Sequence, residues 1–486
     1  MSSGTVKIKR APDSMDCCSL TVDEVLKATG GTVIRKPPIR VFKGLSTDSR
    51  SISKGTLFLP IIGERFDGHD FIASAIVGGA SGSLIQKGLE EKNKLIPGDV
   101  TLILVDDTLK ALGDIAHFWR SKFEIPVIGL TGSTGKTTTK EMAAGIIGLT
   151  KRVLKNRGNF NNLIGLPLTL LEMNVSHEVA ILEMGTNRRG EIERLTRIAK
   201  PDVGLITNIG PVHLEGLKSM DVVKEEKWDL FNNMGISGVA VINGDDDLLN
   251  TVAGRWKGKT ITFGIKKDAD ARAEQIKKSR DKGVSFTLNI GGNERNVMMS
   301  TLGEHNIYNA LAAAASSWAV GIEYDLICEG LMSFKPIDGR MNILRLKNGA
   351  FLIDDTYNAN PESVSAALKT LKELRGKHVS TVILGDMLEL GEWAEEMHEG
   401  IGSLMADTGV AKIFLRGRLT RTVAEGAIKK GLKSDQIYFP ETTEEIVTHL
   451  KSYLKKRDWV LVKGSRKMKM EEIVQEITRE FGLKEG

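Results

Sequence analysis

The residues with the clearest capacity for chemistry form a short loop, Thr131-Gly-Ser-Thr-Gly-Lys-Thr137. Glycines let the backbone turn tightly and direct its N–H groups at phosphate oxygens, and a following helix N-terminus adds a favourable field. In such loops the lysine contacts the β- and γ-phosphates, and the last hydroxyl binds Mg²⁺. The loop is a variant, because the glycine usual at Leu130 stands one residue earlier, at Gly129. We therefore predict an ATP phosphate site at Gly132, Ser133, Thr134, Gly135, Lys136, Thr137 and Thr138.

Further polar side chains follow short apolar runs. Glu183 ends the run Val179–Leu182 and is a candidate Mg²⁺ ligand, because carboxylate oxygens suit this ion. A solvated glutamate at a strand end is the alternative. His213 lies beyond another run, and by itself it is more typical of a structural histidine. Lys224 and Lys227 lie on a helical stretch whose charges are more typical of a solvated face.

Two later segments carry polar groups at suggestive spacings. Asn306 and Asn309 are one helical turn apart and share a face, so they would either read a purine edge or cap the helix. Asp355 lies in a polar loop, Asp354–Pro361, between a predicted strand and a predicted helix. It would either hold a ribose hydroxyl or act as part of an N-cap.

The elements that must position these residues follow an α/β pattern. Val127–Leu130 predicts a strand that enters the loop, and Thr138–Ile147 predicts the helix after it. Other predicted strands end in polar residues, as ligand-binding strands of open parallel sheets do. They are Val179–Leu182, Val203–Ile206 and Val239–Ile242.

The remaining chain divides at a break near Pro336–Gly339. Before it, residues 266–299 are charged and strand-like, which predicts an insertion or a set of antiparallel strands. After it, a second α/β alternation has candidate strands at Phe351–Ile353, Thr381–Leu384, Ile413–Leu415 and Val460–Val462. We predict three α/β domains, at residues 1–125, 126–337 and 338–486, which agrees with the length of 486 residues.

Composition narrows the class of protein. Apolar residues make up 41% and charged residues 27%, so the chain can bury cores and stay in solution. No stretch approaches the roughly 20 apolar residues of a membrane span, and the N-terminus lacks the apolar core of a signal, so we expect a cytoplasmic protein. A net charge of +5 and few aromatic residues give no reason to expect nucleic acid. The three cysteines form neither a disulfide framework nor a metal-binding spacing.

Together these segments resemble the Mur ligase family, which builds the peptide stem of peptidoglycan. The resemblance runs from about residue 40 to residue 470 and rests on segments such as "TGSTGKTTTKEM", "EMGTNRRGEI", "TNIGPVHLEGLKS", "GEHNIYNALAAAA" and "DDTYNANPES". It implies a uridine-nucleotide-binding first domain, a central P-loop ATPase domain with a parallel sheet, and a Rossmann-like C-terminal domain. It also implies an ATP-dependent ligase that adds D-alanyl-D-alanine to UDP-N-acetylmuramoyl-tripeptide through an acyl-phosphate.

The resemblance assigns metal and catalytic roles that the residues alone leave open. Glu183 matches a ligand of a first Mg²⁺ ion, and His213 matches a ligand of a second. Lys227 matches a carbamylated lysine, which is chosen over Lys224 because Trp-Asp-Leu-Phe follows it. A carbamate is an anionic oxygen ligand, whereas an ammonium would repel Mg²⁺. The implied catalytic residues are Lys136, His213, Lys227 and Arg340, and the implied metal ligands are Thr137, Glu183, His213 and Lys227.

The same resemblance places the substrates. Asn306 and Asn309 match adenine contacts, Arg340 an arginine that reaches the phosphates, and Asp355 and Tyr357 positions near the ribose and the γ-phosphate. The residues expected at the uracil nucleotide are Ser46, Asp48, Ser49 and Arg50, and those expected at the muramoyl substrate are Asn159, Asn161 and Asn162.

Several alternatives stay open. The chain could be another Mur ligase or a folylpolyglutamate-type ligase, or a P-loop ATPase that makes no amide. The segment "LGDMLELGE" is similar to the dipeptide-adding member, and we expect the longer segment "LGDMLELGEWAEEMHE" to form part of the amine site. The residues before about Leu20 match no part of the family pattern. A monomer is expected, and the base that deprotonates the amine is not identified.

Overall fold

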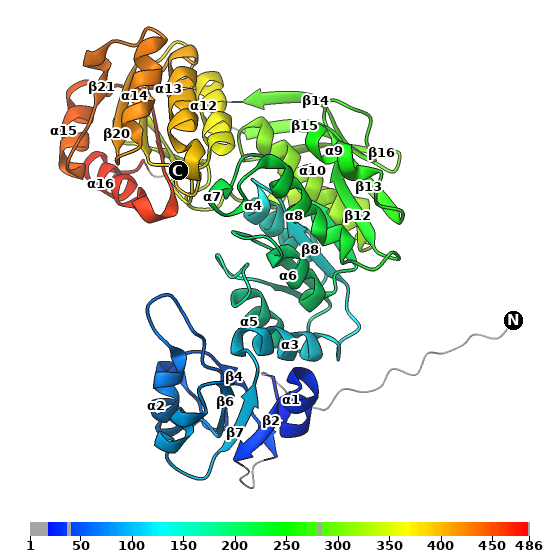
Figure 1. Cartoon of the computed structure of the whole chain (residues 1–486). Coiled ribbons are helices and arrows are strands. Elements are labelled where there is room, and N and C mark those ends of the chain that lie inside the picture. The colour runs from blue at the N-terminus through cyan, green and yellow to red at the C-terminus, as the bar shows by residue number, and fades with distance from the viewer. Residues whose placement is uncertain (1–17, 36–39, 280–282, 485–486) are drawn as a thin grey trace, which may run out of the picture.

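Three β-sheets, each covered by helices, organise the chain in the computed structural model (Figure 1). The structure describes residues 18–35, 40–279 and 283–484. In Figure 1 the N-terminal sheet lies below, and the central and C-terminal sheets lie side by side above it. The extension before Leu20 falls largely outside the described residues.

The N-terminal sheet has the strand order β2-β7-β6-β5-β4, in which only β2 runs antiparallel to its neighbour. A separate antiparallel pair, β1 with β3, lies beside it. The strands are β1 Leu20–Thr21, β2 Thr32–Arg35, β3 Val41–Phe42, β4 Leu45–Ser46, β5 Leu57–Phe58, β6 Gly82–Gln86 and β7 Thr101–Val105. The helices are α1 Val22–Thr29, α2 Ile72–Val77 and α3 Thr108–Arg120.

The central sheet has nine strands in the order β16-β15-β14-β13-β12-β11-β8-β10-β9. All pairs from β9 to β14 are parallel, and β14, β15 and β16 are antiparallel. The strands are β8 Val127–Thr131, β9 Val153–Lys155, β10 Val179–Glu183, β11 Val203–Ile206, β12 Val239–Asn243, β13 Lys259–Gly264, β14 Ala271–Ser279, β15 Gly283–Ile290 and β16 Asn293–Met299.

Helices cover both faces of this central sheet, because its strands are almost continuously apolar and buried on both sides. One face packs against α4, α10 and α11, and the other against α5, α6 and α8. The helices are α4 Lys136–Ile147, α5 Gly165–Leu171, α6 Glu191–Ala199, α7 Leu214–Leu217, α8 Met220–Asn232, α9 Asp247–Ala253, α10 Glu304–Ala319 and α11 Tyr324–Ser333.

The C-terminal sheet has the order β17-β18-β22-β19-β20-β21, and only β17 is antiparallel. Its strands are β17 Asn342–Arg345, β18 Phe351–Asp355, β19 Ser380–Gly385, β20 Lys412–Arg416, β21 Ile437–Tyr438 and β22 Trp459–Lys463. One face packs against the first three of its helices and the other against the last two. These are α12 Pro361–Arg375, α13 Ala394–Asp407, α14 Thr420–Lys429, α15 Thr443–Tyr453 and α16 Glu471–Phe481.

The α/β fold class and the predicted strands are confirmed. Residues 266–299 contain the antiparallel strands β14, β15 and β16, which was one of the two alternatives. The predicted helix after the P-loop begins at Lys136, two residues earlier than expected. The domain boundaries at residues 125 and 337 stay a prediction, although each predicted domain contains one of the three main sheets.

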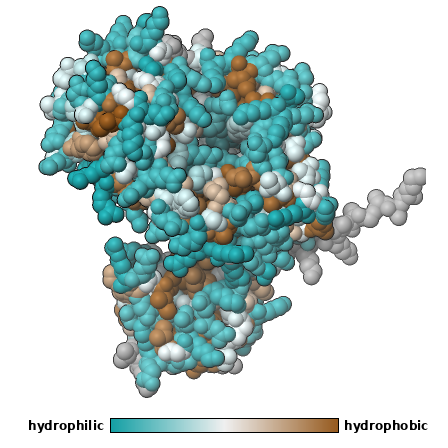
Figure 2. Space-filling model, turned by 45° about the horizontal axis from the view of Figure 1, so that its top comes forward, coloured by the Kyte–Doolittle hydropathy of each residue, from teal (hydrophilic) through white to brown (hydrophobic). Residues whose placement is uncertain are grey.

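The face shown in Figure 2 is mostly hydrophilic, with small hydrophobic patches. Exposed hydrophobic side chains are scattered over all three parts of the chain. Examples are Phe66, Val77, Phe160 and Phe439. Among the described residues, no helix combines the length and the apolar character that crossing a membrane requires.

Candidate functional site

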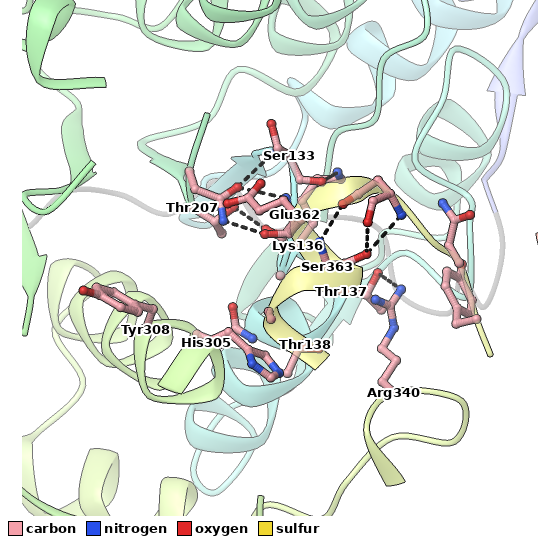
Figure 3. A pocket seen from close by; sticks show the side chains of 18 of the residues that line it. Ser133, Lys136, Thr137, Thr138, Thr207, His305, Tyr308, Arg340, Glu362 and Ser363 are labelled. Atoms are coloured by element: carbon pink, nitrogen blue, oxygen red, sulfur yellow. Dashed lines mark hydrogen bonds between the residues drawn. The ribbon is translucent and has the colours of Figure 1, made fainter. Parts of the chain in front are cut away.

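A cleft of about 900 Å³ lies where the central and C-terminal sheets' loops meet. From the central part, the ends of β8, β10, β11 and β12 open into it, which is where ligands bind in open parallel sheets. From the C-terminal part, the loop after β18 and the start of α12 line it. Figure 3 shows the side chains of both parts converging on the P-loop.

The P-loop connects β8 to α4 and contains two glycines. A side chain at either position would collide with neighbouring atoms unless those atoms moved. Gly132 has φ +149°, and a Cβ there would lie 1.9 Å from Thr207 Oγ1. Gly135 caps α4 with φ +78°, and a Cβ there would lie 2.1 Å from Asn309 Oδ1. Asn208 fixes the loop from β11, since its Oδ1 accepts hydrogen bonds from the Ser133 and Thr134 N–H groups.

Lys136 and Thr137 begin α4 and face the cleft. The Lys136 ammonium donates to Gly132 O at 2.6 Å, and burial lowers its pKa although the Glu183 charge opposes this. The Thr137 hydroxyl donates to Glu183 Oε2 at 2.9 Å. Asn161 donates to the other oxygen of Glu183, also at 2.9 Å. A bound phosphate group would give the buried Lys136 ammonium an anionic partner.

Arg340 crosses from the C-terminal part into this network. Its guanidinium donates to Thr137 Oγ1 at 2.9 Å and lies 4.0 Å from the centre of the Tyr357 ring. Asp355, which ends β18, forms an ion pair with the buried Lys463 at 2.6 Å. Asp355 is therefore not the N-cap of the next helix; that role belongs to Asn360.

His213 and Lys227 lie near the same network by different routes. His213 has a left-handed backbone, with φ +53°, and its Nδ1 is 2.8 Å from Glu389 Oε2 of the C-terminal part. Burial lowers the pKa of His213, although the hydrogen bond to Glu389 opposes this. Lys227 is 1% exposed. Burial, together with the Lys136 charge, lowers the pKa of Lys227 well below its usual value. Lys224, by contrast, pairs with Asp221 at 3.0 Å.

Two groups of predicted asparagines also line the cleft. Asn306 and Asn309 are buried on the first turns of α10, and Asn309 donates to Asn306 Oδ1 at 3.1 Å. Asn159, Asn161 and Asn162 lie between β9 and α5 at the cleft's other side. The structure thus gathers Ser133 to Thr138, Glu183, His213, Arg340, Asp355 and Tyr357 with all five asparagines around one cavity.

The four residues predicted at the uracil nucleotide lie elsewhere. Ser46 ends β4, and Ser49 and Arg50 begin a short 3₁₀ turn that Asp48 caps. Hydrogen bonds from Arg50 lower the pKa of the exposed Asp48 to about 2. None of the four lines the cleft.

Sequence reasoning gave no role to several groups that shape the cleft. Lys463 was missed because it ends an apolar strand far along the chain and meets Asp355 only in the fold. Glu362 was missed because it, too, reaches the cleft only in the fold. Glu389 lies in the segment expected at the amine site, but its contact with His213 was not predicted. The only sequence signal was their place in polar loops after predicted strands.

The donor set fits magnesium only in part. The Thr137 hydroxyl and the Glu183 carboxylate are hard oxygen ligands of the kind that Mg²⁺ prefers. Within the described residues, no group of three His, Cys, Asp or Glu side chains could hold a metal ion. Further ligands would therefore have to come from phosphate oxygens or from a modified side chain.

Three family descriptions match successive parts of the sequence. "Mur ligase family, catalytic domain" matches residues 41–120, "Mur ligase middle domain" residues 130–317, and "Mur ligase, glutamate ligase domain" residues 339–466. Two similar proteins are called UDP-N-acetylmuramoyl-tripeptide–D-alanyl-D-alanine ligase. The one from Bacillus subtilis is 37% identical over 90% of this chain and 93% of its own. The one from Escherichia coli is 34% identical over 89% and 92%.

Solved structures agree with these matches. MurF from Acinetobacter baumannii superposes with a TM-score of 0.87 at 31% identity, covering 96% of this chain and 100% of its own. MurF ligase from Thermotoga maritima in complex with ADP superposes with a TM-score of 0.80 at 28% identity, covering 90% and 97%.

Proposed function

The chain belongs to the Mur ligase family, and we propose that it adds D-alanyl-D-alanine to UDP-N-acetylmuramoyl-tripeptide with consumption of ATP. The observation that carries this proposal is the match over 90% of the chain to a relative of that name. The cleft suits the chemistry, because a P-loop and a crossing arginine face each other within it.

The reaction has two steps. The terminal carboxylate of the tripeptide attacks the γ-phosphorus of ATP, the bond to the β-phosphate oxygen breaks, and an acyl-phosphate and ADP result. The amine of the dipeptide then attacks the acyl carbon, and phosphate leaves as the amide forms. Lys136 and Arg340 neutralise charge on the transferred phosphoryl group in the first step. The loops of the C-terminal part cover the cleft and keep water from the acyl-phosphate.

Thr137, Glu183, His213 and Lys227 would hold two Mg²⁺ ions in this proposal. When bound, these ions supply positive charge to the phosphate oxygens. The neighbours of Glu183 prepare it for that role, since Asn161 and Thr137 fix both of its oxygens. Asn306 and Asn309 hold the adenine, Tyr357 and Asp355 lie toward the ribose and γ-phosphate, and Asn159, Asn161 and Asn162 contact the muramoyl group. Ser46, Asp48, Ser49 and Arg50 bind the uracil nucleotide.

Carbamylation of Lys227 is supported by its surroundings. Among the described residues it has no hydrogen-bond or ion-pair partner, and its lowered pKa favours the neutral amine that reacts with carbon dioxide. The carbamate would remove a buried positive charge beside Lys136 and provide an oxygen ligand. Lys224 lacks these features, because it already pairs with Asp221.

A phosphate-release assay tests the proposed reaction. We expect release from ATP to require both UDP-N-acetylmuramoyl-tripeptide and D-alanyl-D-alanine. Release that is unchanged by adding both would instead indicate a P-loop ATPase without ligase activity. Binding of the UDP-sugar peptide excludes a folate substrate, and single amino acids in place of the dipeptide separate the Mur family members.

Replacing Lys227 tests the carbamate. Lys227→Ala should lower kcat by at least about 10²-fold, because the site loses an anionic ligand, and added bicarbonate or short-chain acids should restore part of it. Lys224→Ala is the matched control, three residues earlier on α8, and should leave kcat unchanged. Full activity of Lys227→Ala would rule out the carbamate.

We further propose a cytoplasmic monomer that binds no nucleic acid.

A further inference from the structure

Glu362 is held at the start of α12 by strong local signals. Pro361 occupies the first helical position, and Asn360 and Ser363 form a reciprocal capping box around it. This geometry aims the Glu362 side chain away from the C-terminal sheet and into the cleft beside the P-loop (Figure 3).

The Glu362 carboxylate makes a close approach to the central part of the chain. A Cβ at Gly210, in the loop after β11, would lie 2.2 Å from Glu362 Oε2 and 2.9 Å from its Cδ. Only glycine leaves room for this approach. The Gly210 N–H donates to Ser133 Oγ at 2.7 Å, so the surface that receives the carboxylate is tied to the P-loop.

Within the described part of the chain, this carboxylate has no hydrogen-bond or ion-pair partner. Its Oε2 is buried without a hydrogen bond, and within the described chain every other carboxylate lining the cleft has a hydrogen bond or an ion pair. A buried oxygen without a partner destabilises the folded protein. Proteins retain such a destabilising group where it takes part in function.

The surrounding charges suit a group that exchanges a proton. Burial raises the pKa of Glu362 to about 6, the Asp246 charge adds to this, and the Lys227 and Lys136 charges oppose it. A carboxyl group in this range is ionised near neutral pH yet accepts a proton readily. The Glu362 charge interacts with the charge of Lys136, the lysine proposed to contact the γ-phosphate.

A purely structural role explains these features less well. Glutamates in a first helical turn often interact with the helix dipole. Glu444, the second residue of α15, has that position and is exposed to solvent. Glu362 occupies the equivalent position in α12 but points into a cavity shared with another sheet's loops. The dipole therefore does not require its burial.

We propose that Glu362 is the general base of the amide-forming step, an inference that rests on the proposed ligase function. Its carboxylate takes one proton from the dipeptide's ammonium group. The freed amine lone pair forms the C–N bond at the acyl carbon, the C–O bond to phosphate breaks, and phosphate carries away the electron pair and the second nitrogen proton. Because α12 belongs to the C-terminal part, the base reaches the reaction only when that part covers the P-loop.

A change of nucleophile tests this role. Hydroxylamine is largely unprotonated at neutral pH, so it attacks an acyl-phosphate without a base. For Glu362→Gln, we expect ligation of D-alanyl-D-alanine to fall about 10²–10⁴-fold. Hydroxamate formation from ATP, UDP-N-acetylmuramoyl-tripeptide and hydroxylamine should stay within about threefold of the wild-type rate, because the first step is untouched.

Two variants keep the outcome interpretable. Glu444→Gln makes the same change at the same helix position and should leave both reactions unchanged. Glu362→Asp keeps a carboxylate and should recover part of the dipeptide ligation. The inference is wrong if Glu362→Gln ligates the dipeptide at the wild-type rate, or if both reactions fall together. Wild-type protein that forms neither product would contradict the ligase function and, with it, this inference.

Discussion

Arg340 is the side chain that most directly joins the two halves of the cleft. It leaves the start of the C-terminal part, stacks on Tyr357, and donates to the hydroxyl of Thr137 on α4. Its Nε is buried and, among the described residues, has no hydrogen-bond partner, so it could donate to an oxygen of the proposed substrate. A planar guanidinium suits this position, because it can stack and donate at once.

Replacement of Arg340 by lysine should therefore lower kcat by about 10²–10³-fold. Lysine keeps the charge but loses the flat stacking face and the fixed donor geometry. Steady-state phosphate release with both substrates measures the effect. Arg345→Lys is a suitable control, because Arg345 also lies near an aromatic ring, Phe351, but outside the cleft. Equal kcat values for the two variants would contradict the assigned role.

At the same scale, Asp67 makes a pH-dependent contribution to the N-terminal part. Burial opposes its ionisation, but hydrogen bonds from Lys92 and His69 lower the pKa of Asp67 to about 2. Because the folded pKa lies below the unfolded value of about 4, the stabilisation is complete above pH 4 and is lost as the pH falls through 2.

Asp67→Asn should accordingly lower the free energy of unfolding by about 1–2 kcal/mol at pH 7. The difference from wild type should shrink between pH 4 and pH 2. Urea unfolding at several pH values measures this. A difference that is constant from pH 7 to pH 2 would show that Asp67 acts through packing rather than charge.

At the scale of elements, the connection from β8 to α4 determines the phosphate site. The strand supplies a rigid base, Gly132 and Gly135 turn the backbone, and Asn208 on the neighbouring strand's loop fixes two N–H groups. The helix then begins with Lys136 and Thr137 facing the cavity. The strand, the two glycines and Asn208 are all needed, because without them the Lys136 side chain would have no fixed orientation.

Gly132→Ala should abolish ATP binding, because its Cβ would collide with Thr207 and the φ angle is unfavourable for alanine. Gly145→Ala is an internal control on α4, where a Cβ meets nothing within 4 Å. That change should raise the free energy of unfolding by up to about 1 kcal/mol and leave ATP binding intact. Calorimetric titration with ATP and urea unfolding give the two readings. Normal ATP affinity of Gly132→Ala would contradict this account.

At the scale of the whole molecule, α3 joins the N-terminal and central parts into one core. It packs against α1 on one side and against α5 and α6 on the other. The Trp119 indole donates to Met173 O, and the Arg120 guanidinium donates to Ala199 O, Phe123 O and Ile125 O. The N-terminal and central parts therefore share one hydrophobic core.

Arg120→Met should lower the free energy of unfolding by about 2–4 kcal/mol, because it leaves three carbonyl groups without their donor while keeping apolar volume. We expect the N-terminal and central parts to lose stability together, as hydrogen exchange would show. The exposed Arg421 on α14 gives a control, Arg421→Met, which should be nearly neutral. Loss confined to the N-terminal part would contradict a shared core.

Much of the fold was predictable because its information is local. Val127–Leu130 and the later apolar runs specify buried parallel strands, and glycines followed by Lys136 and Thr137 specify a phosphate loop, whatever surrounds them. The family resemblance predicted a common neighbourhood for Glu183, His213 and Arg340, and the structure places these three around one cleft.

What the tertiary structure alone decided depends on contacts between distant segments. Burial is a property of the assembled protein, so the sequence could not show that Lys227 lacks a hydrogen-bond or ion-pair partner in the described structure while Lys224 has one. Nor could it show that Asp355 meets Lys463, or that Glu362 reaches Gly210 across two sheets. Charge and pKa in such places follow from desolvation and from neighbours far along the chain, and only the folded arrangement brings those neighbours together.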